Sequence, residues 1–115
     1  MKAVTPFLYR LYNPSYRSEV AVAVLFETFK VIVDSNQNFV LTTHINPDGD
    51  GLGTECALAY FLKQLGKDAL ILNHSATPSN YEFLNQIFPI QQFNPFQHTP
   101  LVEKADVVII IDTNT

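Results

Sequence analysis

Side chains that bind cations gather in THINPDGDGLG, residues 43–53, directly after an apolar run. His44, Asp48 and Asp50 offer one imidazole and two carboxylates, a set that suits a hard or borderline divalent ion such as Mn, Mg, Fe or Co. Carboxylates separated by one residue can also address two ions, with a further carboxylate bridging both. Asp112, which follows the apolar segment VVIII, is the candidate for that bridge. The pattern predicts a metal site of the form H-x-N-P-D-x-D at the end of a strand.

Three glycines in the same segment allow its backbone to curl closely around a site. They are Gly49, Gly51 and Gly53, and a helix that begins near Gly51 would offer its first amide groups to a phosphate. Two simpler interpretations remain open on these residues alone. An Asp-Gly-Asp-Gly sequence also forms solvated turns, and Asp48 or Asp50 could simply cap the helix.

Other loops rich in glycine and aspartate can be tested by their spacing. An EF-hand would require a bidentate glutamate where Ala57 stands and a helix before the loop, so this interpretation fails. A dinucleotide-binding fingerprint would need a glycine at Thr54 and an acid after the second strand, and the match is weak. A P-loop is excluded, because no lysine lies between Lys30 and Lys63. A metal site therefore accounts best for the segment.

Hydrophobic periodicity predicts the elements that must position these residues. Polar residues share one face of residues 19–34, which is typical of a helix, whereas FVLTT lacks polar alternation and suits a strand covered on both faces. Five consecutive β-branched residues near the end of the chain are typical of a central parallel strand. The predicted order is a helix at 19–34, a strand at 39–43, a helix at 53–66 ending at Gly66, a strand at 68–73, a helix at 78–87 with a Ser79 to Glu82 capping box, and a strand at 107–111.

This alternation predicts an α/β fold, a parallel β-sheet with flanking helices. Ligands of open parallel sheets gather beyond the carboxyl ends of the strands. His44 and Asp112 each follow the end of a predicted strand, so both should face the same crevice.

Several other side chains receive structural roles. Glu55 would stabilise the dipole of the first helical turn, and His74 and His98, in polar loops, are expected at the surface. Cys56 is expected in the core together with the apolar stripe of its helix. That stripe comprises Leu58, Phe61, Leu62 and Leu65.

Length and composition indicate one small globular domain. The 115 residues are 47% apolar and 16% charged, and the net charge of -4 offers no basic surface for unaided nucleic-acid binding. A polyanionic substrate would therefore need bound cations. A lone cysteine argues against a disulfide framework, and the sequence shows neither a signal peptide nor a membrane-spanning run. We expect a soluble, cytoplasmic protein without a membrane partner, in which residues 1–18 form a locally packed arm.

Four segments, HINPDGDGLG, ECALAYFLKQLGK, PSNYEFL and VVIIIDT, give the chain its likeness to a known family. In that order, over residues 20–115, they resemble the N-terminal part of a DHH-family phosphoesterase. The nearest type is the oligoribonuclease and pAp phosphatase (nanoRNase), and RecJ-like exonucleases and family II pyrophosphatases are more distant.

The resemblance assigns a role to each candidate ligand. It implies that His44 and Asp48 bind one Mn²⁺ or Mg²⁺ ion, that Asp50 binds a second ion and that Asp112 bridges the two. It also implies that Asp48, Asp50 and Asp112 are the catalytic carboxylates. The implied reaction is hydrolysis of phosphodiester or phosphomonoester bonds in short oligonucleotides or pAp by a hydroxide held between the ions.

The sequence departs from that family in one large respect. In the family, the name-giving Asp-His-His, a further metal-binding Asp and a C-terminal domain that grips substrate follow the bridging Asp, and none of them occurs up to Thr115. We therefore expect residues 19–115 to be the truncated N-terminal part of a DHH phosphoesterase domain, which alone binds metal weakly and turns over poorly. A chain ending on a hydrophobic strand should also form homo-oligomers through that edge.

Two other functions stay open on these residues. The same site could act on pyrophosphate or polyphosphate within the same superfamily. Alternatively, the glycine loop and the helix N-terminus could form a non-catalytic module that holds a phosphate or a nucleotide without metal. A metal-dependent rise in melting temperature would separate this module from the two enzymes.

Overall fold

The structure is a computed structural model that describes residues 18–112 of the chain. The arm expected at residues 1–18 lies outside this range except for its last residue. The described residues form helices and strands in the order α2 (Ser18–Ser35), β1 (Asn38–Thr43), α3 (Gly49–Gln64), β2 (Asp68–Asn73), the 3₁₀ helix η1 (Ser79–Gln86), β3 (Ile90–Gln92), α4 (Pro95–Glu103) and β4 (Val107–Ile111).

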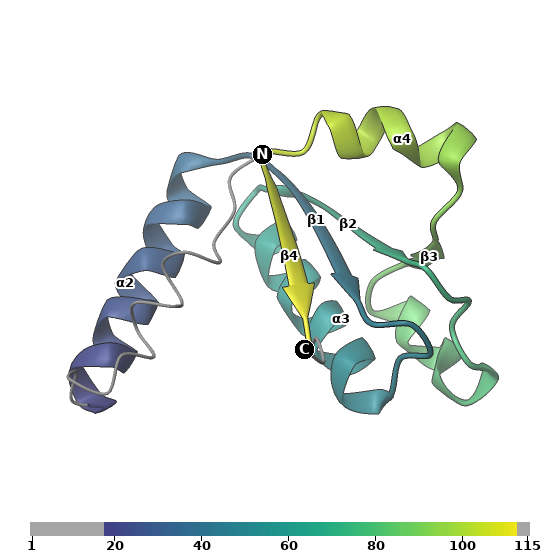
Figure 1. Ribbon diagram of the computed structural model, residues 1–115, viewed down its shortest axis with the longest axis horizontal. Coiled ribbons are helices and arrows are strands. Elements are labelled where there is room, and N and C mark those ends of the chain that lie inside the picture. The colour runs from purple at the N-terminus through teal and green to yellow at the C-terminus, as the bar shows by residue number, and fades with distance from the viewer. Residues whose placement is uncertain (1–17, 113–115) are drawn as a thin grey trace.

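The four strands of the described region form one fully parallel sheet in the order β3-β2-β1-β4 (Figure 1). β1 lies between β2 and β4, and its last residue, Thr43, stands opposite Ile111, the last residue of β4. The predicted α/β fold with a parallel sheet and flanking helices is thereby confirmed. The carboxyl ends of β1 and β4 consequently meet at the same edge of the sheet.

Two apolar clusters cover the two faces of β1. Phe39 and Leu41 pack in the larger cluster with Leu52 and Ala59 of α3, which lies behind the strands in Figure 1. Val40 points the other way, into a smaller cluster that includes Val102 near the end of α4 and Ala105 just after it. Because successive side chains of a strand point to opposite faces, β1 is buried on both sides, as its lack of polar alternation predicted.

Helix α3 begins earlier and buries a different face than predicted. It starts at Gly49 instead of residue 53, and its Gly66 stop is confirmed by a left-handed φ of 80°. In the predicted stripe Leu62 is buried, but Phe61 is 49% and Leu65 50% exposed. The sheet contacts the neighbouring face, because the helix has more apolar residues than one face can hold. Its buried residues are Gly51, Leu52, Glu55, Cys56, Ala59 and Leu62.

The segment between β2 and β4 holds three further differences from the prediction. The helix expected at residues 78–87 is the 3₁₀ helix η1, and no side-chain hydrogen bond caps it, so the Ser79 capping box was wrong. β3 and α4 were not predicted, although Asn94, which accepts from the amides of Phe96 and Gln97, is a recognisable helix cap before a proline. His98, expected at the surface, is buried on α4, where its Nδ1 accepts from the Asn94 amide.

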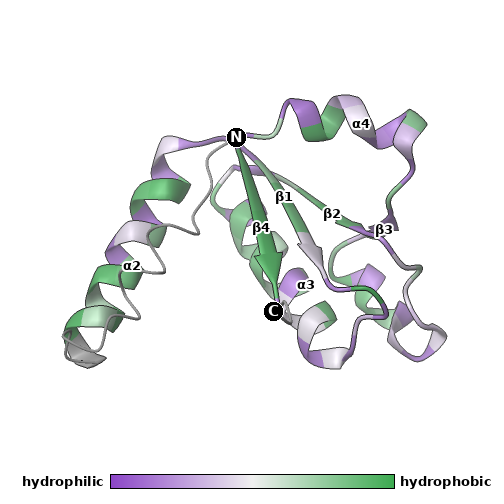
Figure 2. Ribbon diagram, in the orientation of Figure 1, coloured by the Kyte–Doolittle hydropathy of each residue, from purple (hydrophilic) through white to green (hydrophobic). Residues whose placement is uncertain are grey.

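β4 was predicted as a central strand, but it lies at the edge of the sheet that the described residues form. Its Ile110 is exposed, and α2, along which Figure 2 shows hydrophobic residues, also carries exposed apolar side chains, among them Phe26 and Val31. Five β-branched residues therefore indicated a parallel strand correctly without indicating how many neighbours it has.

Within residues 18–112, no helix is both long enough and apolar enough to span a bilayer.

Candidate metal centre

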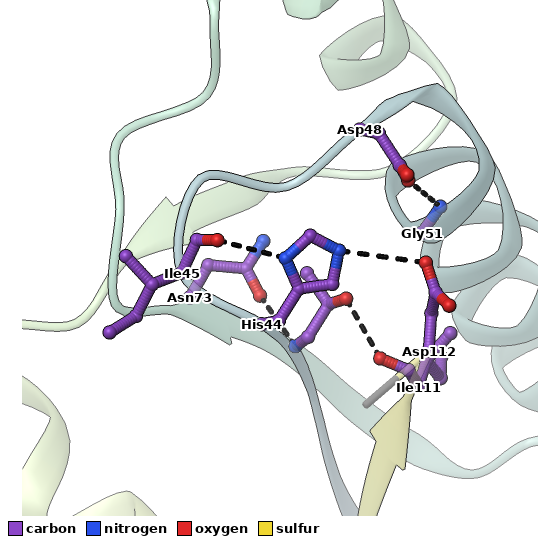
Figure 3. A network of polar contacts seen from close by, with 8 residues as sticks. His44, Ile45, Asp48, Gly51, Asn73, Ile111 and Asp112 are labelled. Atoms are coloured by element: carbon purple, nitrogen blue, oxygen red, sulfur yellow. Dashed lines mark hydrogen bonds and ion pairs between the residues drawn. The ribbon is translucent and has the colours of Figure 1, made fainter. Parts of the chain in front are cut away.

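The parallel pairing of β1 and β4 brings two predicted ligands together. Thr43 and Ile111 end the two strands side by side, so the next residues, His44 and Asp112, leave the sheet at adjacent positions. His44 Nε2 lies 3.5 Å from Asp112 Oδ2 (Figure 3). Asp112 has a φ of 53°, in the left-handed region, which aspartate tolerates better than most residues. The predicted meeting of these two side chains at one end of the sheet is confirmed.

A tight turn then carries the chain from β1 to α3. Asn46 takes a left-handed φ of 54°, its amide donates to the Ser75 hydroxyl at 3.0 Å, and Pro47 is buried. Asp48 is the N-cap of α3, and its Oδ1 accepts from the Gly51 amide at 3.0 Å. The interpretation of Asp48 as a helix cap is therefore correct, and this bond also fixes where its carboxylate lies (Figure 3).

His44, Asp48 and Asp112 form the one group of potential metal ligands that the described residues contain. One ligand atom of each side chain lies within 4.8 Å of the others, and Asp50, in the first turn of α3, does not belong to the group. His44 is 23% and Asp112 46% exposed, so the site opens to solvent. One imidazole and two carboxylates at this separation can bind a divalent ion such as Mn²⁺ or Mg²⁺.

The His44 ring is oriented by its own neighbour in the chain. Its Nδ1 lies 2.8 Å from the Ile45 carbonyl oxygen, which can only accept, so Nδ1 carries a proton and Nε2 faces Asp112. Nε2 pairs with that carboxylate when the ring is protonated, and its lone pair is free for a cation when the ring is neutral. The bond to the Ile45 carbonyl, followed by the negative charges of Asp112 and Asp48, raises the pKa of His44 above 6.5, while partial burial opposes the rise. The hydrogen bond to Ile45 and the two carboxylates thus favour positive charge at this site.

The three glycines of the motif differ in what surrounds them. A Cβ at Gly51 would lie 2.9 Å from the Thr43 hydroxyl, and one at Gly49 would lie 3.0 Å from the Tyr81 ring. At Gly53 a Cβ would meet nothing within 4 Å. The expected close approach of the backbone is therefore present at Gly49 and Gly51 and absent at Gly53.

This difference predicts opposite effects for two alanine substitutions. Gly51→Ala should lower the free energy of unfolding by about 1–3 kcal/mol, because the new methyl group displaces the Thr43 hydroxyl from the Ile111 carbonyl, 2.8 Å away. Gly53→Ala should raise it by up to about 1 kcal/mol through helix propensity. Urea unfolding of both variants measures this. A Gly51→Ala variant as stable as Gly53→Ala would contradict the close packing.

Glu55 and Asn73 form a buried polar pair that the sequence did not reveal. Glu55 was assigned to the helix dipole, but its side chain is 0% exposed and its Oε2 accepts from Asn73 Nδ2 at 2.9 Å. Its Oε1 has no hydrogen-bond partner among the described residues. Burial raises the pKa of Glu55 from 4.5 to about 7, against the smaller opposing effect of the Asn73 bond. The burial of Glu55 could have been predicted from its spacing, because it lies on the same helical face as Leu52 and Ala59.

A comparison with solved structures places this fold beside a known one. The chain is similar to the crystal structure of an exopolyphosphatase-related protein from Bacteroides fragilis, with a TM-score of 0.69 and 24% sequence identity. The similarity covers 77% of this chain and 27% of that chain, so this chain spans about a quarter of the length of that protein. No protein-family model and no curated protein matches the sequence. At this identity the likeness establishes the fold alone.

Proposed function

We propose that this chain supplies part of the active site of a metal-dependent phosphoesterase that acts on short oligonucleotides or pAp. The observation that carries the proposal is the convergence of His44, Asp48 and Asp112, which come from the end of β1, the start of α3 and the end of β4. Three separate segments bring an imidazole and two carboxylates within 4.8 Å of one another at the edge where parallel sheets bind their ligands.

The same residues have distinct roles in this proposal. His44, Asp48 and Asp112 hold one divalent ion, and Asp50, two residues after Asp48 in the first turn of α3, contributes with Asp112 to a second. Mn²⁺ or Mg²⁺ bound there would neutralise phosphate charge and activate water for attack at phosphorus. The Ile45 carbonyl keeps the His44 ring in the tautomer that ligates through Nε2. Residues 19–115 would form the N-terminal part of the catalytic domain, and the resemblance to DHH phosphoesterases places the further metal ligands of such a domain after the bridging Asp112.

The metal-free alternative has less support in the geometry. A phosphate held by the N-terminus of α3 needs free amide donors, but Asp48 already accepts from the Gly51 amide and places a negative charge at that terminus. The site therefore favours a cation over a phosphate, and an anionic substrate would bind after the metal.

A second enzymatic candidate keeps the same site and changes the substrate. The similar structure from Bacteroides fragilis is described as exopolyphosphatase-related, which favours pyrophosphate or polyphosphate. Oligonucleotides, pAp and polyphosphate all present phosphoryl oxygens to the metal and differ in what lies beyond them. The substrate is thus decided by surfaces outside the metal centre.

Thermal unfolding with added ligands tests the proposal. Mn²⁺ at a hundredfold excess over its Kd should stabilise the chain by about 2.7 kcal/mol. In Mn²⁺, pAp or a dinucleotide should raise the Tm further, and without Mn²⁺ it should have no effect. A rise with pAp in a chelator would instead support the metal-free module. A larger rise with pyrophosphate than with pAp in Mn²⁺ would favour the second enzyme.

A further inference from the structure

We propose that Glu55 and Asn73 are positioning residues of the metal centre, which hold the ligand-bearing ends of β1 and β4 in place against α3. This inference rests on the proposed function of the site. Among the described residues neither forms a hydrogen bond to His44, Asp48 or Asp112, and both are 0% exposed. They therefore act through the backbone to which the ligands belong.

Hydrogen bonds of side chains connect four elements in sequence. Asn73, the last residue of β2, donates through Nδ2 to Glu55 of α3 at 2.9 Å and accepts through Oδ1 from the Thr43 amide of β1 at 3.2 Å. The Thr43 hydroxyl continues the chain by donating to the Ile111 carbonyl of β4 at 2.8 Å. Figure 3 draws both of these bonds in the same view as the three candidate ligands.

Two residues of this hydrogen-bond chain directly precede a candidate ligand, and a third lies on the helix that Asp48 caps. Thr43 immediately precedes His44, and Ile111 immediately precedes Asp112. On the other side, Glu55 anchors the helix whose N-cap is Asp48. A shift of α3 against the sheet would move Asp48 relative to the other two ligands, and the Glu55 to Asn73 bond opposes that shift. The three ligands thus share one buried support.

The cost of burying these groups also favours a positioning role. A buried carboxyl group with one unpaired oxygen costs free energy that an apolar side chain of similar size would not. Glu55 lies on the buried face of α3 together with Leu52, Cys56 and Ala59 of the apolar core. Packing alone therefore does not account for Glu55, whereas the geometry of its bond to Asn73 does.

The test compares Mn²⁺ affinity among four variants of the 115-residue chain, measured by titration calorimetry at a temperature where each is folded. Glu55→Leu and Asn73→Ala, which each break the chain of bonds, should weaken Mn²⁺ binding about tenfold or more. Glu55→Gln, whose carboxamide oxygen still accepts from Asn73, should restore the affinity to within about threefold of the original. Leu62→Ala, a buried position on the same helix without a polar bond, should lower the Tm and leave the affinity unchanged.

Each result bears on the proposal. Unchanged affinity in Glu55→Leu and Asn73→Ala, or an equal loss in Leu62→Ala, would overturn it. If Glu55→Leu does not fold, Asn73→Ala decides alone. If the original chain binds no Mn²⁺, the proposed function fails. The rate of hydrogen exchange at the Thr43 amide then tests whether Glu55 and Asn73 hold the end of β1 in place. Faster exchange in Asn73→Ala and Glu55→Leu than in Leu62→Ala would show that the two residues hold the end of β1 in place, and equal exchange would refute this.

Discussion

Replacing Asp112 with asparagine is expected to remove the stabilisation of this chain by Mn²⁺. Asparagine keeps the shape of the side chain and tolerates the left-handed φ of 53°, so the backbone at the end of β4 should be retained. It lacks the negative charge that the ion requires. Loss of a direct ligand should weaken the affinity about a hundredfold, the upper end of what even indirect partners of a metal contribute.

The thermal consequence is large enough to measure without ambiguity. At Mn²⁺ concentrations that stabilise the original chain by about 2.7 kcal/mol, a Kd a hundredfold weaker leaves about 0.4 kcal/mol. For a domain of this size the Mn²⁺-induced rise in Tm should fall from roughly 10–20 °C to roughly 2–3 °C. Without metal the variant loses both the repulsion between Asp112 and Asp48 and the ion pair between Asp112 and His44, so its stability should stay close to that of the original.

Two further substitutions complete the design. Asp34→Asn makes the same change of charge on an exposed residue of α2 and should keep the full response to Mn²⁺. Asp50→Asn tests the ligand of the second ion, and it should reduce the response less than Asp112→Asn, because Asp50 lies outside the group around His44. A chain in which Asp112→Asn responds to Mn²⁺ like Asp34→Asn would have no metal centre at this edge.

Glu55 should make the chain more stable in mild acid than at neutral pH. Its pKa is about 7 in the folded state and 4.5 as the ordinary value, so between these values the folded chain holds a proton that the unfolded chain has released. The stabilisation is complete below about pH 4.5 and is lost as the pH rises through about 7. A shift of this size corresponds to about 3 kcal/mol in the free energy of unfolding.

Urea unfolding from pH 5 to 8, without metal, measures this effect in the original chain and in Glu55→Gln. The original chain should lose stability as the pH rises, whereas the variant should follow a flatter profile because its amide does not titrate. His44, whose pKa is also raised, contributes to both profiles and cancels in their difference. Parallel profiles would show that Glu55 does not titrate in this range. Another interaction would then have to offset the cost of burying its ionised carboxylate.

Much of the site was predictable because it depends on features local to single strands. FVLTT and VVIII read as buried parallel strands from their apolar runs, and parallel strands that neighbour each other end at the same edge. His44 and Asp112 each follow such a run, so their meeting followed once the two strands were paired. The cap at Asp48 also follows from local sequence, since Asp is a preferred N-cap before a glycine-rich first turn.

The sequence by itself thus determined the α/β class, the strands that carry the candidate site and the three side chains that meet there, His44, Asp48 and Asp112. The tertiary structure alone decided which face of α3 is buried, that β4 lies at an edge of the described sheet, and that Glu55 meets Asn73 in the interior. The physical reason is distance along the chain. Local periodicity shows that a helix has an apolar side, whereas the partner of a buried polar group is chosen by packing between segments, here 18 residues apart for Glu55 with Asn73 and 30 for Asn73 with Thr43.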